Sequence, residues 1–124
     1  MGGYGALLFV ALHSFQRRVR PGTRAVAVGA MSPALWLEYD EVAPGAFDDV
    51  QDFERSQVFG RPSGFQDVAV RIDCGRDDPF AGAANELRKE LHAAGGLQAG
   101  AHTAGYWRRM LPDQLRFLGT KVAG

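Results

Sequence analysis

Two polar side chains in this sequence stand where acid–base chemistry could take place. Asp78 comes shortly after Val68–Cys74, an apolar run typical of a buried strand, and His102 lies in the glycine-rich Gly100–Thr103 after a weaker strand signal. Open sheets of parallel strands carry their sites at the carboxyl ends of the strands. A carboxylate there can orient a histidine and stabilise its protonated form. We therefore interpret Asp78 and His102 as candidate members of one site.

Each of these residues also has a structural explanation. An aspartate directly before Pro79 is typical of an N-cap whose helix begins with proline. Asp77 competes with Asp78 for the role of the acid, and Asp73 would lie within the strand. A histidine in a glycine-rich loop is commonly a solvated side chain. His102 is a candidate because it follows the aspartate in chain order, each after a predicted strand.

Other reactive residues give weaker candidates. His13 and His92 lie in helical patterns, and we interpret them as structural or exposed. Ser32 lies near a strand end but lacks the sequence pattern of a nucleophile turn. Cys74 ends a strand and is interpreted as a small buried hydrophobe. Neither Ser32 nor Cys74 is the favoured nucleophile.

The elements that would position these residues alternate between strands and helices. Short apolar runs predict the strands Ala25–Ala30, Val68–Cys74 and Leu97–Ala101, the first of them a central one. Helical patterns cover Gly2–Gln16, Pro79–Ala94 (closed by Gly95-Gly96) and Tyr106–Lys121, which would bend or restart at Pro112, and shorter helices are expected around Pro33–Tyr39 and Phe47–Ser56. This alternation predicts an α/β fold with a mostly parallel sheet of about three strands and helices on both faces.

The stretch from about 34 to 66 is less regular than the rest. Pro44, Gly45 and Gly60 interrupt any long element there. Its aromatic residues give it apolar surface with which to pack over the mouth of a cleft, so we interpret it as a lid-like insertion within a single partial domain, 1–124.

Composition excludes several classes of function. The 124 residues are 46% hydrophobic and carry 14 basic and 14 acidic side chains, so no electrostatic attraction to nucleic acid or to a membrane surface is expected. The apolar run Ala6–Leu12 is too short to span a bilayer. One cysteine offers neither an intramolecular disulfide nor a metal cluster, and no metal or cofactor is expected. The compartment, cytoplasmic or secreted, is left open, because a targeting signal would precede Met1.

The first seven residues, Met1–Leu7, are rich in glycine and resemble the second half of a nucleophile elbow. In the G-x-S-x-G elbow, a serine sits on a sharp turn between a strand and a helix. Gly3 would be the closing glycine of this motif, and the serine would directly precede Met1, where this sequence has no residue. The chain order of serine, aspartate and histidine is that of the α/β-hydrolases.

Four segments in order resemble one family of α/β-hydrolases, the esterases related to esterase D, the S-formylglutathione hydrolases and the secreted mycolyltransferase antigens. The segments are Met1–Leu7, Ser32–Leu35, Gly75–Phe80 and His102–Pro112. The first is similar to the family's S-M-G-G-Y-G-A-L, the third to its G-x-x-D-x-F acid loop, and the fourth to its histidine loop with H-x-x-x-Y-W. The acid-loop pattern selects Asp78 over Asp77.

The resemblance implies serine-esterase or acyl-transfer chemistry on a small acyl ester. His102 would act as general base and then general acid, and Asp78 would hold its imidazole. The nitrogen of Met1, as the residue after the serine, would belong to the oxyanion hole.

Three hypotheses follow for the chain as it stands. It is the C-terminal portion of a serine esterase, inactive alone because it lacks the nucleophile. Alternatively, it is a non-catalytic interaction module derived from the hydrolase fold, which self-associates through an exposed sheet edge. A weaker third hypothesis is residual hydrolysis through Ser32 or Cys74 with His102.

Overall fold

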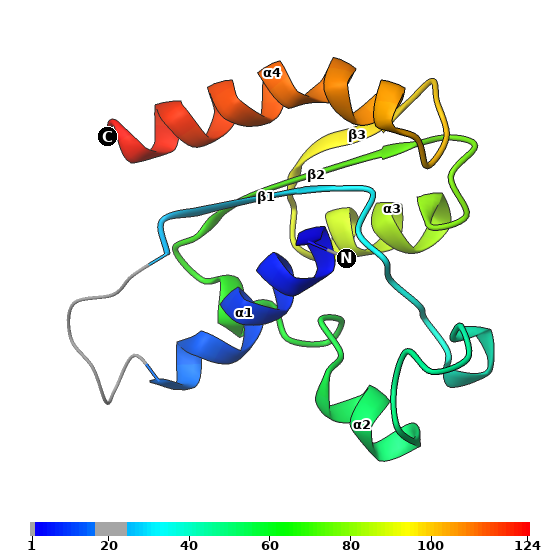
Figure 1. Ribbon diagram of the computed structural model, residues 1–124. Coiled ribbons are helices and arrows are strands. Elements are labelled where there is room, and N and C mark those ends of the chain that lie inside the picture. Colours follow the sequence, from blue (N-terminus) through cyan, green and yellow to red (C-terminus); the bar gives the residue numbers. More distant parts are fainter. Residues whose placement is uncertain (1, 17–24) are drawn as a thin grey trace.

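The computed structural model describes residues 2–16 and 25–124 (Figure 1). In chain order the elements are helix α1 (Gly2–Gln16), strand β1 (Ala27–Met31), the 3-10 turn η1 (Tyr39–Glu41), helix α2 (Val50–Arg55), the 3-10 turn η2 (Pro62–Phe65), strand β2 (Ala69–Gly75), helix α3 (Ala81–Glu90), strand β3 (Ala94–Gln98) and helix α4 (Ala104–Val122). The expected residue at the oxyanion hole, Met1, lies outside the described residues. No helix in the described ranges combines the length and apolarity needed to cross a bilayer.

The strands form one parallel sheet in the order β1-β2-β3. Helix α4 covers one face of the sheet, and α1 and α3 cover the other (Figure 1). Apolar side chains from the sheet and from α1 and α3 make the core, among them Leu7, Ile72 and Leu87, each no more than 1% exposed. The predicted α/β class, a parallel sheet of three strands flanked by helices, is confirmed.

The position of the strands differs from the prediction in two ways. β2, and not the first strand, is the central strand, since β1 and β3 each pair with it. The third strand begins at Ala94 and ends at Gln98, earlier than the predicted Leu97–Ala101. Gly95 and Gly96 are therefore strand residues paired with β2, and they do not close a helix.

The reason lies in how closely the backbones approach at this point. A Cβ on Gly95 would overlap the backbone of Ile72, so glycine is required for strand packing. In the sequence, a pair of glycines looks the same whether it ends a helix or lies in a strand that packs closely against a neighbouring strand. Helix α3 accordingly ends at Glu90 and is shorter than the predicted Pro79–Ala94.

The helical predictions in the irregular stretch were only partly right. No helix covers Pro33–Tyr39, where the chain forms only the single turn η1 near the end of that range. The helix predicted over Phe47–Ser56 is confined to α2, whose N-cap Asp49 accepts a hydrogen bond from the N–H of Asp52 at 2.8 Å.

Helix α4 continues through Pro112 without restarting. Proline removes one backbone donor and normally interrupts a helix. Here Tyr106 and Met110 on one side of the proline and Gln114 on the other are all buried against the rest of the protein. Packing of both halves on one sheet outweighs the lost hydrogen bond.

The glycines at the start of α1 do not all serve close packing. A Cβ on Gly3 would lie 3.2 Å from the carbonyl oxygen of Met31 at the end of β1, whereas Gly2 and Gly5 have open space around them. Gly3, the expected closing glycine of the elbow, is thus the point where α1 approaches the sheet.

Candidate active site

The structure brings Asp78 and His102 together beyond the carboxyl ends of β2 and β3. The His102 Nδ1 lies 2.8 Å from the Asp78 Oδ2, and the Asp78 side chain is fully buried while the imidazole is 38% exposed. The ionised Asp78 carboxylate can only accept, so the Nδ1–H of His102 donates to it, and Nε2 is the nitrogen left to exchange protons with a substrate. The pair is oriented as a base held by a carboxylate would be.

Asp78 also binds the backbone just before α3, although it is not the N-cap that the sequence predicted. Its Oδ1 accepts a hydrogen bond from the backbone N–H of Phe80 at 2.8 Å, although α3 itself starts at Ala81 with Phe80 as N-cap. One carboxylate oxygen of Asp78 therefore accepts a hydrogen bond from the backbone of the turn, and the other pairs with His102.

The surroundings keep Asp78 ionised. Burial raises the pKa of its carboxyl, but hydrogen bonds from the Phe80 N–H, from His102 and from Ser32 outweigh this effect, and the net pKa is lowered from its usual value. A buried carboxylate is stable only when donors surround it in this way.

The loops that carry the two residues are joined to each other along their backbones. The N–H of Arg76 donates to the carbonyl of Gln98 at 2.8 Å, and the N–H of Asp77 donates to the carbonyl of Gly100 at 2.9 Å. Gly75 permits this approach, since a Cβ there would overlap the carbonyl of Gly100. The short distance between Asp78 and His102 follows from this backbone pairing.

Aromatic rings hold the imidazole on two sides. The His102 ring lies 5.8 Å from Phe80 and 5.0 Å from Trp107, in both cases edge to face. The indole N–H of Trp107 donates to the Oγ of Ser32 at 3.1 Å. The histidine is therefore fixed by packing as well as by its carboxylate.

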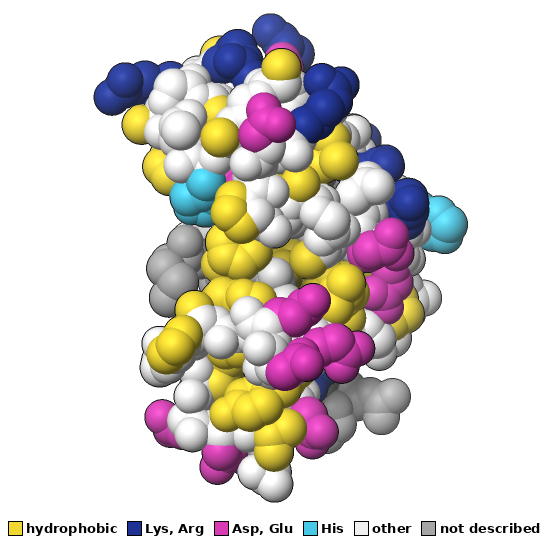
Figure 2. All heavy atoms as spheres, turned by 90° about the vertical axis from the view of Figure 1, so that its right-hand side faces the viewer, with side chains coloured by type: hydrophobic (Ala, Val, Ile, Leu, Met, Phe, Trp, Pro, Cys, Tyr) yellow, Lys and Arg dark blue, Asp and Glu magenta, His cyan; other side chains and the backbone are white. Residues whose placement is uncertain are grey.

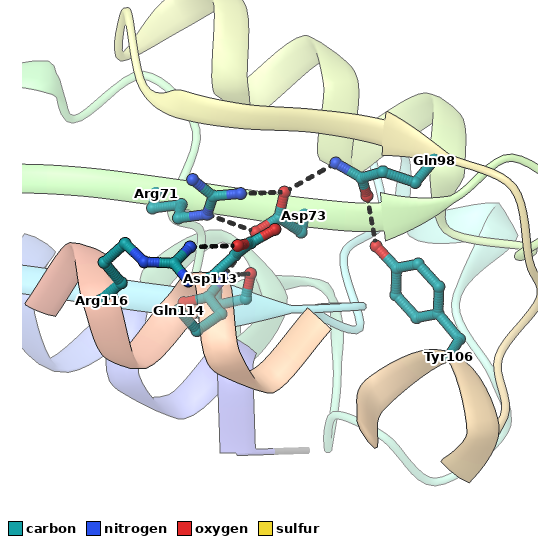
Figure 3. Close-up of polar contacts among 8 residues, drawn as sticks. Arg71, Asp73, Gln98, Tyr106, Asp113, Gln114 and Arg116 are labelled. Carbon is teal, nitrogen blue, oxygen red and sulfur yellow. Dashed lines mark hydrogen bonds and ion pairs between the residues drawn. The ribbon is translucent and has the colours of Figure 1, made fainter. Parts of the chain in front are cut away.

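A buried polar cluster anchors the histidine loop to the sheet (Figure 3). The Tyr106 hydroxyl donates to the Gln98 Oε1 at 2.7 Å, and the Gln98 amide donates to the Asp73 carboxylate at 2.8 Å. Gln98 ends β3 and Tyr106 stands in the first turn of α4, so this chain of bonds fastens both ends of the segment that holds His102.

Asp73 is the centre of this cluster and is fully buried. Its carboxylate accepts from the Arg71 Nε at 2.6 Å and from the Gln114 amide at 2.8 Å, as well as from Gln98. Burial and the nearby Asp73 raise the pKa of the Tyr106 hydroxyl, which remains a donor. The sequence placed Asp73 in the strand but did not reveal its partners, Gln98 and Gln114. The signal that could have indicated them was the presence of a polar glutamine in a predicted strand and in a predicted helix that pack against the sheet.

The remaining sequence candidates do not join the pair as reactive groups. Ser32 is 3% exposed and holds Trp107, and Cys74 is fully buried. Burial raises the pKa of the Cys74 thiol to about 12, so no thiolate forms near neutral pH. His92 is exposed at the far end of α3, and the side chain of His13 lies outside the described part of α1.

A cavity of about 540 Å³ is lined in part by Phe80, whose ring centroid lies 5.8 Å from that of His102. It is lined by the Leu35–Leu37 segment, the start of α3 and two carboxylates, Glu41 and Glu86. Figure 2 shows this side of the molecule, with hydrophobic side chains across its middle and acidic side chains beside them. Within residues 2–16 and 25–124, no group of three or more His, Cys, Asp or Glu side chains is placed to hold a metal ion.

Two solved esterase structures share this arrangement of elements. A ferulic acid esterase matches with a TM-score of 0.65 and 21% identity, over 95% of this chain and 48% of that one. The S-formylglutathione hydrolase of Staphylococcus aureus matches with a TM-score of 0.57 and 15% identity, over 95% of this chain and 51% of that one. No family model and no curated protein matches the sequence.

The likeness establishes the class of fold. The chain has the α/β-hydrolase fold of these esterases and spans about half of their length. The resemblance that the sequence motifs carried is thus confirmed at the level of the fold.

Proposed function

We propose that this chain is the acid- and histidine-bearing part of a serine esterase. The observation that carries the proposal is the 2.8 Å contact between the His102 Nδ1 and the buried carboxylate of Asp78 at the carboxyl ends of parallel strands. The esterase neighbours, of which the chain spans about half, support the same class of reaction.

In the proposed reaction, a serine on a segment that precedes helix α1 attacks the ester carbonyl carbon. The Nε2 of His102 removes the hydroxyl proton as the C–O bond forms, and it returns that proton to the leaving alcohol when the ester bond breaks. Water then attacks the acyl-enzyme by the same exchange and releases the carboxylic acid. Asp78 keeps the imidazole in the required tautomer and stabilises its protonated form.

The amide of the residue after the serine, Met1, would donate to the oxyanion. The 124 residues alone then lack both the nucleophile and a complete oxyanion hole, so we expect only background hydrolysis from them. Ser32 and Cys74 do not replace the serine, because both are buried and Cys74 keeps its proton.

The first test concerns the pair itself and uses the chain as it stands. We expect a far-downfield proton resonance from the His102 Nδ1–H, which disappears in Asp78→Ala and persists in Asp77→Ala. Asp77 is the matched control because it is the adjacent aspartate and its side chain is exposed. Loss of the resonance in Asp77→Ala but not in Asp78→Ala would overturn the assignment of the acid.

The second test concerns the reaction. The codons upstream of Met1 should encode a G-x-S turn, and a chain extended through them should hydrolyse p-nitrophenyl acetate. In that longer chain His102→Ala should lower kcat by at least about 10³-fold. An active longer chain that is indifferent to His102→Ala would refute the proposal.

A second candidate function, a non-catalytic interaction module, is favoured by the outer surface of β1. Among the described strands, β1 pairs with β2 and forms one edge of the sheet, and Phe9 and Leu12 of α1, a helix that packs on β1, are 51% and 42% exposed. An unpaired strand edge beside apolar side chains can recruit a second copy. Sedimentation equilibrium should then show a dimer that Phe9→Glu dissociates; a monomer at all concentrations would exclude this function.

A further inference from the structure

We propose that the cavity beside Phe80 binds the bulky part of the ester and that Glu41 and Glu86 make it select neutral or cationic groups over anionic ones. The inference rests on the proposed function, because it places the ester carbonyl at His102. The volume, about 540 Å³, falls within the range of pockets that bind small molecules.

Phe80 connects the cavity to the histidine. Its ring centroid lies 5.8 Å from that of His102 and 5.3 Å from that of Trp36, which lines the cavity. A ligand seated against Trp36 therefore lies beside Phe80, the ring that also packs against the imidazole. The cavity thus adjoins the place where the chemistry is proposed.

The walls suit a flat or bulky apolar group. Leu35 is 4% exposed, and Trp36 is held edge to face by Phe80 and by Phe47, at 5.3 and 6.0 Å. Rings fixed in this way provide apolar surface that loses little conformational entropy when a ligand binds. Pro79 and Ala83 add further apolar surface at the start of α3.

The charges at the cavity are negative. Glu41 and Glu86 line it, and its lining within the described chain includes no lysine or arginine. The Glu41 carboxylate accepts the backbone N–H of Glu38 at 3.4 Å, which holds it in place. Glu86 lies 3.7 Å from the Lys89 Nζ, but both side chains are more than half exposed, so this pair offsets little of the negative field. A carboxylate on the ligand would be repelled by Glu41 and Glu86.

The test uses three naphthalene compounds that differ in charge: 2-naphthoate, 2-naphthamide and 2-naphthylmethylammonium. Binding to the 124-residue chain is measured by NMR titration at low ionic strength, where charge effects are least screened. We expect the amide and the ammonium compound to shift the Trp36 indole and Phe80 amide signals, and the carboxylate to bind at least about threefold more weakly. Equal affinities for the three compounds, or shifts that map elsewhere, would overturn the inference.

Variants distinguish the contribution of the two carboxylates, Glu41 and Glu86, from that of the apolar lining of the cavity. Glu41→Gln with Glu86→Gln should bring the three affinities together, whereas Glu54→Gln with Asp113→Asn removes the same charge away from the cavity and should preserve their order. Ala83→Leu, which fills the cavity from α3, should weaken the amide at least about tenfold, and Trp36→Ala should do the same if it folds. If the three affinities kept their order in Glu41→Gln with Glu86→Gln, the two carboxylates would not determine which ligand charge the cavity prefers.

Failure of this inference and failure of the proposed function give different results. Charge-ordered binding together with hydrolysis that ignores His102 would leave the cavity as a charge-selective binding site and remove the esterase function. Absence of binding together with His102-dependent hydrolysis in the longer chain would remove the cavity assignment alone.

Discussion

The indole N–H of Trp107 donates a hydrogen bond to the Oγ of Ser32 at 3.1 Å, between residues 75 positions apart in the sequence. Ser32 directly follows β1, and Trp107 stands in the first turn of α4. Because the Trp107 ring also lies 5.0 Å from that of His102, this bond ties the sheet to the surface against which the imidazole packs. Ser32 therefore supports the candidate site from behind without being a nucleophile.

The coupling between these two residues can be measured by a double-mutant cycle. Trp107→Phe and Ser32→Ala should each lower the free energy of unfolding by about 1–2 kcal/mol, because each removes one partner of a partly buried hydrogen bond. The double variant should lose less than the sum of the two, by about 0.5–1 kcal/mol, since the bond between Trp107 and Ser32 can be lost only once. Urea unfolding measures all four chains; strict additivity would show that the bond contributes nothing.

The lowered pKa of Asp78 predicts how stability depends on pH. A carboxyl whose folded-state pKa lies below the unfolded value of about 3.9 contributes stability above that value and loses it as the pH falls through the folded-state pKa. Asp78→Asn should therefore be less stable than the wild type near neutral pH, and the difference should shrink in acid below about pH 4. Thermal unfolding across this range provides the measurement. A gap that stays constant with pH would indicate a purely steric effect of the substitution.

Asp73 should matter more for stability than a comparable surface aspartate. Asp73→Asn places an amide among the N–H donors of three residues, Arg71, Gln98 and Gln114, and should cost about 3–5 kcal/mol. Asp113→Asn is the control, since Asp113 is 46% exposed and forms an ion pair with Arg116 at 2.7 Å on the surface, and its loss should cost less than about 1 kcal/mol. Denaturant midpoints compare the two variants. Similar shifts in both would contradict the central role of Asp73.

The class of fold and the two loops of the candidate site could be predicted from the sequence, because both depend on local patterns. Apolar runs bounded by turns mark strands, and a polar residue after such a run falls at the carboxyl end of the sheet. That rule pointed to the two loops, and the acid-loop resemblance selected Asp78 within the first of them. The alternative explanation of Asp78 as the N-cap of a helix that begins at Pro79 was wrong, because α3 begins at Ala81 with Phe80 as its N-cap, although one Asp78 oxygen accepts the Phe80 N–H.

The order and register of the strands could not be read in this way, since pairing is decided by tertiary packing. β2 is central because both neighbours pair with it, a fact that no single run of residues encodes. Gly95 gave the signal of a helix end but serves a close backbone approach. Gln98 and Gln114 form the polar cluster only because their register brings them to Asp73, and neither is distinctive in isolation.

Gly75 offers the sharpest test of how the site is assembled. A Cβ at this position would overlap the carbonyl of Gly100, so Gly75→Ala must push the histidine loop away from the acid loop. We expect a loss of at least about 2 kcal/mol in the free energy of unfolding and loss of the downfield His102 proton signal, because backbone atoms cannot yield as a flexible side chain can. Gly82→Ala in α3 is the matched control, since a Cβ there meets no atom within 4 Å and alanine favours a helix by up to about 1 kcal/mol. If Gly75→Ala kept both its stability and the His102 signal, the two loops would not owe their contact to the glycine, and the backbone bonds from Arg76 to Gln98 and from Asp77 to Gly100 would be sufficient to hold them.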